Sequence, residues 1–371
     1  MIALARIISA FEGEFHSRYG KRLLPSQDHA LAALKHCRTT RSPRMQVECS
    51  DCHQQHYVPH SCGHRSCPHC QHHESEQWLQ RQLKRQVPAE YFLLTFTLPA
   101  QLRPLAWDHQ RVVYDALLRA SWDTLRTFSQ NDKHLKGTPG AIAVLHTHSR
   151  RLDYHPHVHV IMPAAAIDAK RRLWRTKTSR KGSSPWLFAH KALARVFRAK
   201  VLDALGSADL SIPERTPARW VVDCKAVGSG KKALVYLGRY LYRGVIREKD
   251  ILACKDGHVT FRYRDSKTKR WETRTLAGAD FLWLVLRHVL PRRFRRTRNF
   301  GFLHPNSKRM ITLVHLLLKV DLGNALAFFK PRPAFTCSEC GGIMKVIRTR
   351  LPPPRCARER PPDGLRACLV M

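Results

Sequence analysis

The stretch Asp153–Met162, "DYHPHVHVIM", places a histidine at every second position of an otherwise apolar, β-branched run. Successive side chains of a strand point to opposite faces, so His155, His157 and His159 are expected to project together. Neighbours on one face lie roughly 7 Å apart along the backbone, close enough for two imidazoles to hold one metal ion. The pattern also fits a half-buried strand whose polar face happens to be imidazole, so the rest of the chain has to decide between these interpretations.

The segments around this strand predict an α+β fold on a mainly antiparallel sheet with flanking helices. The run 141–149 reads as a strand that the polar turn 150–154 joins to the histidine strand as an antiparallel hairpin. Further strands are predicted at 90–99, 219–227, 251–264 and 270–276, and helices at 111–128, 186–205, 231–246 and 280–290. We expect three domains: an N-terminal helix with a small cysteine-rich zinc-binding domain at 1–87, a catalytic domain at 88–310, and a C-terminal helix with a basic tail at 311–371.

The charge predicts a polyanionic partner. Across 371 residues, 65 Lys and Arg outnumber 28 Asp and Glu, giving a formal net charge of +37 spread along the chain. Such a field suits phosphate neutralisation with counterion release. No run approaches the roughly 18 apolar residues of a membrane span, and the N-terminus lacks the pattern of a signal peptide. We therefore expect a cytoplasmic protein that binds nucleic acid and no membrane.

The cysteines indicate metal. Twelve occur, and the pairs Cys49-x2-Cys52 and Cys67-x2-Cys70 are separated by fourteen residues. Two such pairs can close a tetrahedral tetrathiolate zinc site, which would be structural because no position is left open for a substrate. The remaining cysteines of this segment, Cys37 and Cys62, could bind a second ion with nearby histidines or could be ordinary buried thiols. The helix expected at 74–87 has a basic face that suits either phosphate or solvent.

The C-terminal third of the chain offers weaker patterns. The pair Cys337-x2-Cys340 is half of a zinc site, which Cys356 and Cys368 could complete. The segment 291–302, "PRRFRRTRNFGF", interleaves arginine with phenylalanine, and Arg295 and Arg296 lie at its centre. This composition suits phosphate binding with base stacking, or a solvated basic face anchored by a few phenylalanines.

The helix at 231–246, "KKALVYLGRYLYRGVI", carries two tyrosines at helical spacing. Tyr236 and Tyr240 lie four residues apart and therefore share a face. An aromatic core stripe is the ordinary explanation, but lysines and arginines flank these tyrosines rather than large apolar groups. Those cations are Lys231, Lys232, Arg239 and Arg243, and we expect them to contact DNA.

Histidines, tyrosines and basic charge together predict one chemistry. A tyrosine hydroxyl is a weak nucleophile at neutral pH because its pKa is near 10. A divalent ion on a phosphate oxygen would draw charge from phosphorus and favour attack. The tyrosine oxygen could then cleave a DNA phosphodiester, leaving a covalent phosphotyrosine and a free hydroxyl. The bond energy is kept in that link, so rejoining would need no ATP.

The chain resembles the HUH-type two-tyrosine transposases of rolling-circle insertion sequences, the family numbered ninety-one. "HPHVHV" (155–160) is similar to their histidine–hydrophobe–histidine motif, and "YLGRY" (236–240) to their tyrosine motif. The cysteine segments at 37–43, 49–52 and 61–70 resemble their N-terminal zinc-binding domain, and 281–303 resembles the end of their catalytic domain. The resemblance runs from about residue 25 to 310, with the motifs in the family's order.

The resemblance implies roles for individual residues. His157 and His159 would bind a catalytic Mg²⁺ or Mn²⁺, and Tyr236 and Tyr240 would be the nucleophiles. The third metal ligand is left open: His146 could serve if the hairpin register places it beside His157, and Asp153 and His155 are the alternatives. One tyrosine would cleave the donor strand and the other the target or terminus, with Zn²⁺ as the structural ion.

These expectations amount to rolling-circle DNA transposition on single-stranded element ends and target DNA, with host replication proteins as candidate partners. A plasmid replication initiator or a relaxase with the same chemistry is one alternative, although the cysteine-rich domain favours the transposase. A zinc-containing protein that binds nucleic acid without catalysis is the other.

Overall fold

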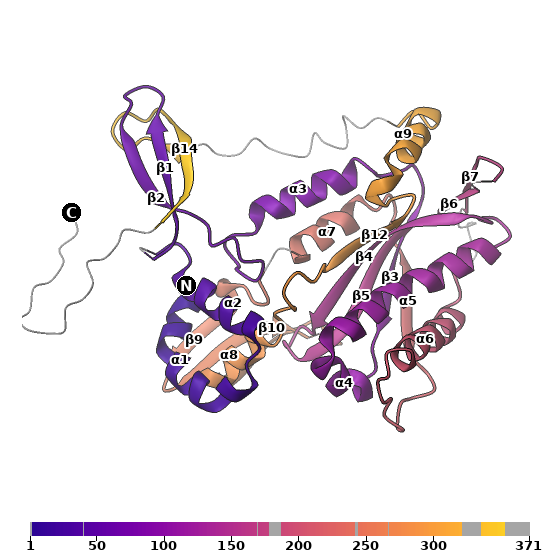
Figure 1. Cartoon of the computed structure of the whole chain (residues 1–371), viewed down its shortest axis with the longest axis horizontal. Helices are drawn as coiled ribbons and strands as arrows, with labels where there is room; N and C mark the ends of the chain where they lie inside the picture. Colours follow the sequence, from indigo (N-terminus) through magenta and orange to yellow (C-terminus); the bar gives the residue numbers. More distant parts are fainter. Residues whose placement is uncertain are drawn as a thin grey trace, which may run out of the picture.

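The structure is a computed structural model that describes residues 2–39, 41–168, 170–177, 187–241, 244–265, 267–320 and 335–352. A twisted sheet forms its centre (Figure 1). Five antiparallel strands lie in the order β12-β4-β5-β3-β8, and two short strands, β6 and β7, extend the sheet beyond the start of β4. The strands are β3 (Tyr91–Thr97), β4 (Thr138–His148), β5 (Tyr154–Pro163), β6 (Ala165–Asp168), β7 (Leu173–Thr176), β8 (Val221–Ala226) and β12 (Thr297–Gly301).

Helices cover both faces of this sheet (Figure 1). One layer contains α4 (Arg103–Asp108), α5 (Gln110–Asn131) and α6 (His190–Gly206), and the other contains α3 (His72–Leu83), α7 (Lys231–Leu241) and α9 (Lys308–Leu317). The alternation of β5 explains this layering. Val158, Val160 and Met162 enter the core beneath α5 and α6, whereas Ile161 enters the core beneath α3 and α7. The histidines of β5 therefore lie on the same sheet face as the tyrosine helix.

A second lobe combines the N-terminus with a segment far along the chain. Its helices are α1 (Leu4–Tyr19), α2 (Pro25–His36) and α8 (Gly278–Leu286), and its sheet consists of β9 (Ile251–Lys255), β10 (His258–Arg264) and β11 (Trp271–Ala277). Ile7, Phe15 and Leu31 share one core with Phe261 and Phe281. The N-terminal helices thus cover an apolar sheet that comes more than 200 residues later.

A small four-stranded sheet lies above the second lobe in the view of Figure 1, at its upper left. Its strand order is β13-β14-β1-β2, all antiparallel, and it unites the two ends of the chain. The strands are β1 (Arg44–Cys49), β2 (Gln55–Pro59), β13 (Phe335–Thr336) and β14 (Ile343–Leu351). We call this sheet the ribbon module. Short 3-10 turns lie elsewhere, at Gly20–Arg22, Ala100–Leu102, Glu248–Asp250 and Pro305–Ser307.

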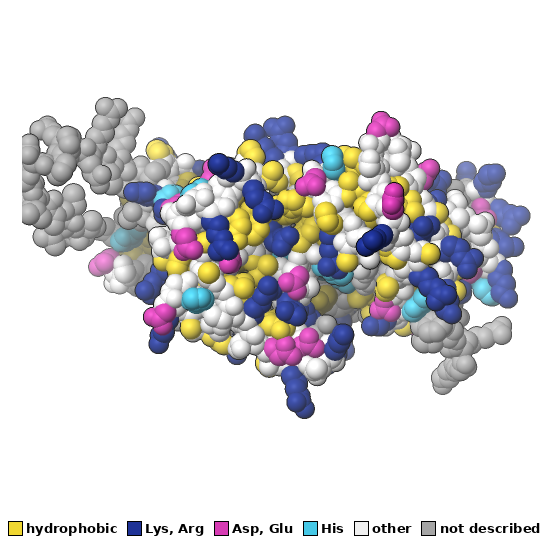
Figure 2. Space-filling model, turned by 90° about the horizontal axis from the view of Figure 1, so that it is seen from below, with side chains coloured by type: hydrophobic (Ala, Val, Ile, Leu, Met, Phe, Trp, Pro, Cys, Tyr) yellow, Lys and Arg dark blue, Asp and Glu magenta, His cyan; other side chains and the backbone are white. Residues whose placement is uncertain are grey.

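The predicted α+β architecture is confirmed, including the hairpin that joins β4 to β5. The segment 291–302, for which the sequence predicted only a basic surface with interleaved phenylalanines, also contains β12, which pairs with β4 in the central sheet. Among the described helices, none combines the length and apolar character that crossing a bilayer requires. Lys and Arg side chains are scattered over the face seen in Figure 2 rather than gathered in one patch.

Candidate active site

Three histidines converge on the face of the sheet that carries the tyrosine helix. His146 on β4 pairs directly with His157 on β5, and the side chain of His159 follows on the same face. The ring centroid of His146 lies 5.1 Å from that of His157 and 4.4 Å from that of His159. One ring nitrogen from each residue lies within 4.8 Å of the other two. A set of three imidazoles at this spacing can hold one divalent ion.

Hydrogen bonds fix two of these imidazoles through the same ring nitrogen. His157 Nδ1 donates to the backbone oxygen of His155 at 2.7 Å. His159 Nδ1 lies 3.0 Å from Thr95 Oγ1 on β3. Occupation of Nδ1 orients each ring and leaves Nε2 as the nitrogen for a metal, which is the usual outer-shell arrangement of ligating histidines. Thr95 was not among the residues predicted for the site, although the alternation of β3 could have marked it.

The electrostatics favour neutral imidazoles, the form that binds metal. Burial, with the neighbouring charge of His159, lowers the pKa of His157 to about 3. Burial likewise lowers the pKa of His159 to about 4, opposed by Asp223. The pKa of His146 is held well below its ordinary value by complete burial and by the two other histidines. All three are therefore uncharged at neutral pH, so a cation would displace no protons from them.

The two other candidate ligands contact arginines instead. His155 Nδ1 lies 2.6 Å from a guanidinium nitrogen of Arg103 and does not join the cluster of three histidines. Asp153 forms an ion pair with Arg274 at 2.9 Å and is 45% exposed. The register of the hairpin therefore singles out His146 as the third imidazole.

Tyr236 on α7 lines the same cavity as the three histidines. This cavity has a volume of about 550 Å³ and is also lined by residues of β10 and by residues 244–247. The Tyr236 side chain is 53% exposed, whereas Leu234 and Leu237 on the same helix are buried. The aromatic-core interpretation therefore fails for Tyr236. Tyr240 and Arg239 belong to α7, but their side chains lie outside the described part of the structure, as do Tyr242 and Arg243 entirely.

The glycine between the two tyrosines brings helices α7 and α3 together. A β-carbon on Gly238 would lie 3.2 Å from the ring of Trp78. Ser75 donates a hydrogen bond of 3.0 Å to the backbone oxygen of Gly238. Close packing on this side turns the face bearing Tyr236 towards the histidines, because rotation of the helix would break both interactions.

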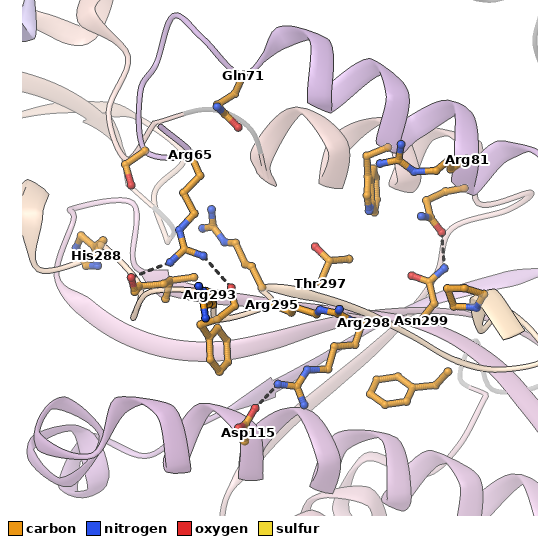
Figure 3. Close-up of a pocket in the computed structure, with 18 of the residues that line it drawn as sticks. Arg65, Gln71, Arg81, Asp115, His288, Arg293, Arg295, Thr297, Arg298 and Asn299 are labelled. Atoms are coloured by element: carbon orange, nitrogen blue, oxygen red, sulfur yellow. Dashed lines mark hydrogen bonds and ion pairs between the residues drawn. The ribbon is translucent and has the colours of Figure 1, made fainter. Parts of the chain in front are cut away.

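A second cavity, of about 910 Å³, adjoins the first and is lined by arginine (Figure 3). The two cavities share His148, Gly244 and Val245. We call this second cavity the arginine groove. Among the described residues, eight arginines but only one carboxylate line it: Arg65, Arg81, Arg85, Arg111, Arg293, Arg295, Arg296 and Arg298, with Asp115. The predicted DNA-binding residues Arg295 and Arg296 are thus brought together here, whereas Lys231 and Lys232 lie at the start of α7 and outside the lining.

Some of these arginines hold the groove together. Arg65 donates to the backbone oxygens of Leu290, Pro291 and Phe294 at 2.6–2.8 Å. Arg298 forms an ion pair with Asp115 across the groove wall, as Figure 3 shows.

Others have their charge available. Within the described part of the chain, no hydrogen bond or ion pair involves the side chains of Arg81, Arg293 or Arg295. The groove therefore offers guanidinium groups that a phosphate chain could satisfy. The basic face predicted for 74–87 is the signal that could have placed Arg81 here.

The phenylalanines of 291–302 are anchors rather than stacking platforms. Phe294 and Phe302 are only 4% and 2% exposed. Phe300 stacks on Trp122 with ring centroids 5.1 Å apart. Of the two interpretations of this segment, the structure supports a basic surface anchored by phenylalanine.

The cysteines form two clusters rather than the single site expected from Cys49, Cys52, Cys67 and Cys70. Cys67 and Cys70 join Cys37 and Cys62, with sulfur separations of 3.2–3.7 Å. Cys49 and Cys52 join Cys337 and Cys340. The single-site prediction is wrong because β1 and β2 carry the first pair to the far end of the ribbon module. Cys356 and Cys368 lie outside the described residues.

The cluster around Cys37 fits zinc and contacts the segment that follows α7. Zinc–sulfur bonds of about 2.3 Å place tetrahedral sulfurs roughly 3.8 Å apart. The loop of this cluster touches the chain beyond the tyrosine helix, since a β-carbon on Gly244 would lie 3.1 Å from the backbone oxygen of Ser66. His69 in the same loop lies 3.0 Å from Glu248. A metal in this cluster would therefore brace the segment that follows α7.

Comparisons with known proteins agree with this geometry. A family model described as "Putative transposase" matches residues 140–310, and one described as "Transposase zinc-binding domain", of IS91 elements, matches residues 7–98. The "Putative transposase y4qJ" of Sinorhizobium fredii is 31% identical over 315 residues, covering 78% of each chain. The chain belongs to the IS91 family of transposases.

Similarity extends to a second transposase and, at much lower identity, to a relaxase of known structure. The transposase for insertion sequence element IS801 of Pseudomonas savastanoi pv. phaseolicola is 30% identical to this IS91-family chain over 269 residues, covering 67% of this chain and 62% of that one. Solved structures of the conjugative relaxase TrwC with oriT DNA share 13% identity, with TM-scores of 0.27 and 0.28. They cover 62–63% of this chain and 72–73% of theirs.

Proposed function

We propose that this IS91-family transposase nicks and rejoins single-stranded DNA through a covalent 5′-phosphotyrosine during rolling-circle transposition. The observation that carries the proposal is that Tyr236 and the three imidazoles line one cavity. The phenolic oxygen of Tyr236 loses its proton and attacks phosphorus. The bond from phosphorus to the 3′ oxygen breaks, and the leaving 3′ oxygen takes up a proton. A second cleavage, for which Tyr240 is the candidate nucleophile, follows the same course. Attack by a 3′ hydroxyl on the phosphotyrosine then breaks the bond between phosphorus and the tyrosine oxygen and rejoins the strands.

The histidine cluster supplies the cation site that this chemistry needs. His146, His157 and His159 would hold Mg²⁺ or Mn²⁺, which when bound to a phosphate oxygen withdraws charge from phosphorus. The chain's own contribution is to keep the imidazoles neutral and oriented through Thr95 and the His155 carbonyl. The half-exposed Tyr236 faces the cavity from α7, so a phosphodiester can enter between the tyrosine and the histidines.

The arginine groove supports a single strand as the substrate. The groove adjoins the histidine cavity through shared lining residues. The sugar-phosphate backbone of a DNA strand lying in the groove would therefore continue into the cavity and place a phosphate near Tyr236. Guanidinium groups bind phosphate without reading bases, and their affinity would depend on salt. Family membership favours transposition over replication initiation or conjugative transfer with the same chemistry.

A cleavage assay tests the proposal. Single-stranded oligonucleotides from both ends of the element are incubated with protein and Mn²⁺ or Mg²⁺, and adducts are mapped by peptide mass spectrometry. We expect a 5′-phosphoryl adduct on Tyr236 or Tyr240 and a free 3′ hydroxyl. Tyr57→Phe, an exposed tyrosine of the ribbon module, is the matched control and should react normally. An adduct that persists in the Tyr236→Phe, Tyr240→Phe double variant would overturn the assignment, and a metal-independent reaction would overturn the role of the histidines.

A further inference from the structure

The ribbon module ends in a second cluster of four thiols drawn from opposite ends of the chain. The sulfurs of Cys49 and Cys340 lie 3.4 Å apart, and those of Cys52 and Cys337 lie 3.7 Å apart. One sulfur from each of the four lies within 4.8 Å of the others. These separations are far longer than a disulfide bond of about 2.05 Å and close to the roughly 3.8 Å expected between sulfurs around zinc.

Each cysteine pair is held in a tight turn at a strand end. Cys49 ends β1, and the backbone N–H of Asp51 donates to its sulfur at 3.4 Å. Cys337 follows β13, and Gly341, which adopts a φ of +75°, donates its N–H to the backbone oxygen of Cys337 at 3.0 Å. A β-carbon on the next glycine, Gly342, would lie 2.9 Å from the sulfur of Cys49. The two turns therefore face each other with their sulfurs inward.

The module has too little apolar core to hold together by itself. Its buried apolar residues are Val47, Met344 and two of the cysteines, Cys49 and Cys337. Sheets of this size without a larger core are marginal in water, and metal binding commonly supplies the missing folding free energy. Exposed apolar side chains on the strands, such as Tyr57 and Ile347, add nothing to that core. Among the described residues of the module, the thiols are the feature positioned to stabilise the union of the two chain ends.

We propose that Cys49, Cys52, Cys337 and Cys340 bind a second structural zinc ion that clamps the C-terminal strands onto the N-terminal ones. The site draws half of its ligands from beyond residue 98, where the match to the zinc-binding family model ends. Cys52 and Cys337 are 285 residues apart in sequence, so the ion closes a loop around the whole catalytic sheet. The proposal does not rest on the proposed nicking activity, and its test measures metal rather than catalysis.

Zinc content of the full chain tests the clamp. We expect two zinc ions per wild-type chain and one in the Cys337→Ser, Cys340→Ser variant. The Cys49→Ser, Cys52→Ser variant should lose the same single ion, and combining all four substitutions should lose no more. Cys254→Ser, at a half-buried cysteine of β9 that belongs to neither cluster, should retain two. A zinc content in the Cys337→Ser, Cys340→Ser variant equal to that of the wild-type chain would overturn the proposal.

The alternative to the clamp is a zinc site that Cys356 and Cys368 complete together with Cys337 and Cys340, and a separate variant tests it. Cys356→Ser, Cys368→Ser should retain two ions, and loss of one there would overturn the clamp. Alkylation of the zinc-loaded wild-type chain needs no variant and so is unaffected by misfolding. Peptide mapping should show Cys337 and Cys340 protected until zinc is chelated, while Cys356 and Cys368 react at once. Equal reactivity of all four before chelation would contradict the clamp.

Discussion

His146 and His157 lie directly opposite each other in the antiparallel pairing of β4 with β5, with their rings 5.1 Å apart. This register turns His146 to the face that carries His157 and His159. A slip of one residue would have turned it to the opposite, apolar face, because side chains alternate along a strand. The pairing therefore decides which residue completes the three-imidazole cluster.

Replacing His146 should weaken metal binding more than replacing His155. We expect His146→Ala to lower Mn²⁺ affinity by at least about 10- to 100-fold, the range typical of losing a partner around a metal site. His155→Ala is the matched control, since it lies on the same strand face but faces Arg103. Isothermal titration of both variants with Mn²⁺ measures the difference. Equal losses would show that the cluster is not the cation site.

The hydroxyl of Thr95 should matter through the ring that it orients. Thr95→Val removes the 3.0 Å hydrogen bond with His159 Nδ1, and we expect roughly 10-fold weaker Mn²⁺ binding with little change in stability. Thr97→Val is the control, because Thr97 lies two residues on along the same half-buried face of β3. An unchanged Mn²⁺ affinity in Thr95→Val would contradict the orienting role.

Gly238 should tolerate no large side chain. Gly238→Val would force its side chain against the ring of Trp78, and we expect the free energy of unfolding to fall by about 2 kcal/mol because of overpacking. Gly206→Ala, at the end of α6 where nothing lies within 4 Å, should be neutral or slightly stabilising. Urea unfolding of the two variants makes the comparison. A neutral Gly238→Val would mean that α7 and α3 can move apart, so that α7 would no longer be held facing the histidines.

The arginine groove should set the salt dependence of DNA binding. Replacing Arg81 or Arg295 by Met should weaken binding to single-stranded oligonucleotides of any sequence. It should also reduce the slope of log affinity against log salt by about 0.7 for each phosphate that the variant no longer neutralises. Arg195→Met, at an exposed position of α6 on the opposite side of the sheet, should leave both unchanged. Fluorescence anisotropy over a salt series gives the slopes, and parallel lines for all variants would exclude the groove as the binding surface.

Acidification should lower the free energy of unfolding, because the buried histidines stay neutral in the fold and take up protons in the unfolded chain. In the unfolded chain imidazoles take up protons below about pH 6.5, whereas the pKa values of His157 and His159 in the fold are about 3 and about 4, so both stay neutral. The unfolded state then binds more protons, so the free energy of unfolding falls as pH drops from about 6.5 towards about 4.

The His157→Asn, His159→Asn variant isolates this effect. From about pH 7.5 to about pH 5.0, the wild-type chain should lose roughly 2 to 4 kcal/mol more than the variant, because asparagine does not titrate. Urea unfolding without added divalent cation measures both, and zinc release from the cysteines cancels in the comparison. Identical pH profiles would show that these imidazoles are not neutral in the fold.

The chemistry of the local elements could be predicted from the order of residues alone. Alternation in 153–162 put three histidines on one strand face, and helical spacing placed Tyr236 and Tyr240 together on one helix, because both patterns follow from backbone geometry alone. Hairpin signals and apolar runs were sufficient for the α+β architecture. The cysteine pairs indicated metal, since the residue types and the two-residue spacing within each pair are local properties.

Which distant residues come into contact depends on the three-dimensional fold. Cys49 and Cys67 each begin a pair of cysteines with the same spacing. Because β1 pairs with β14, the pair that begins at Cys49 lies beside Cys337, whereas the pair that begins at Cys67 lies beside Cys37. Arg81 and Arg295 share a groove because β12 adds to the sheet beneath α3. Local spacing cannot specify such meetings, since they depend on register and on the burial of apolar faces contributed by segments more than 200 residues apart.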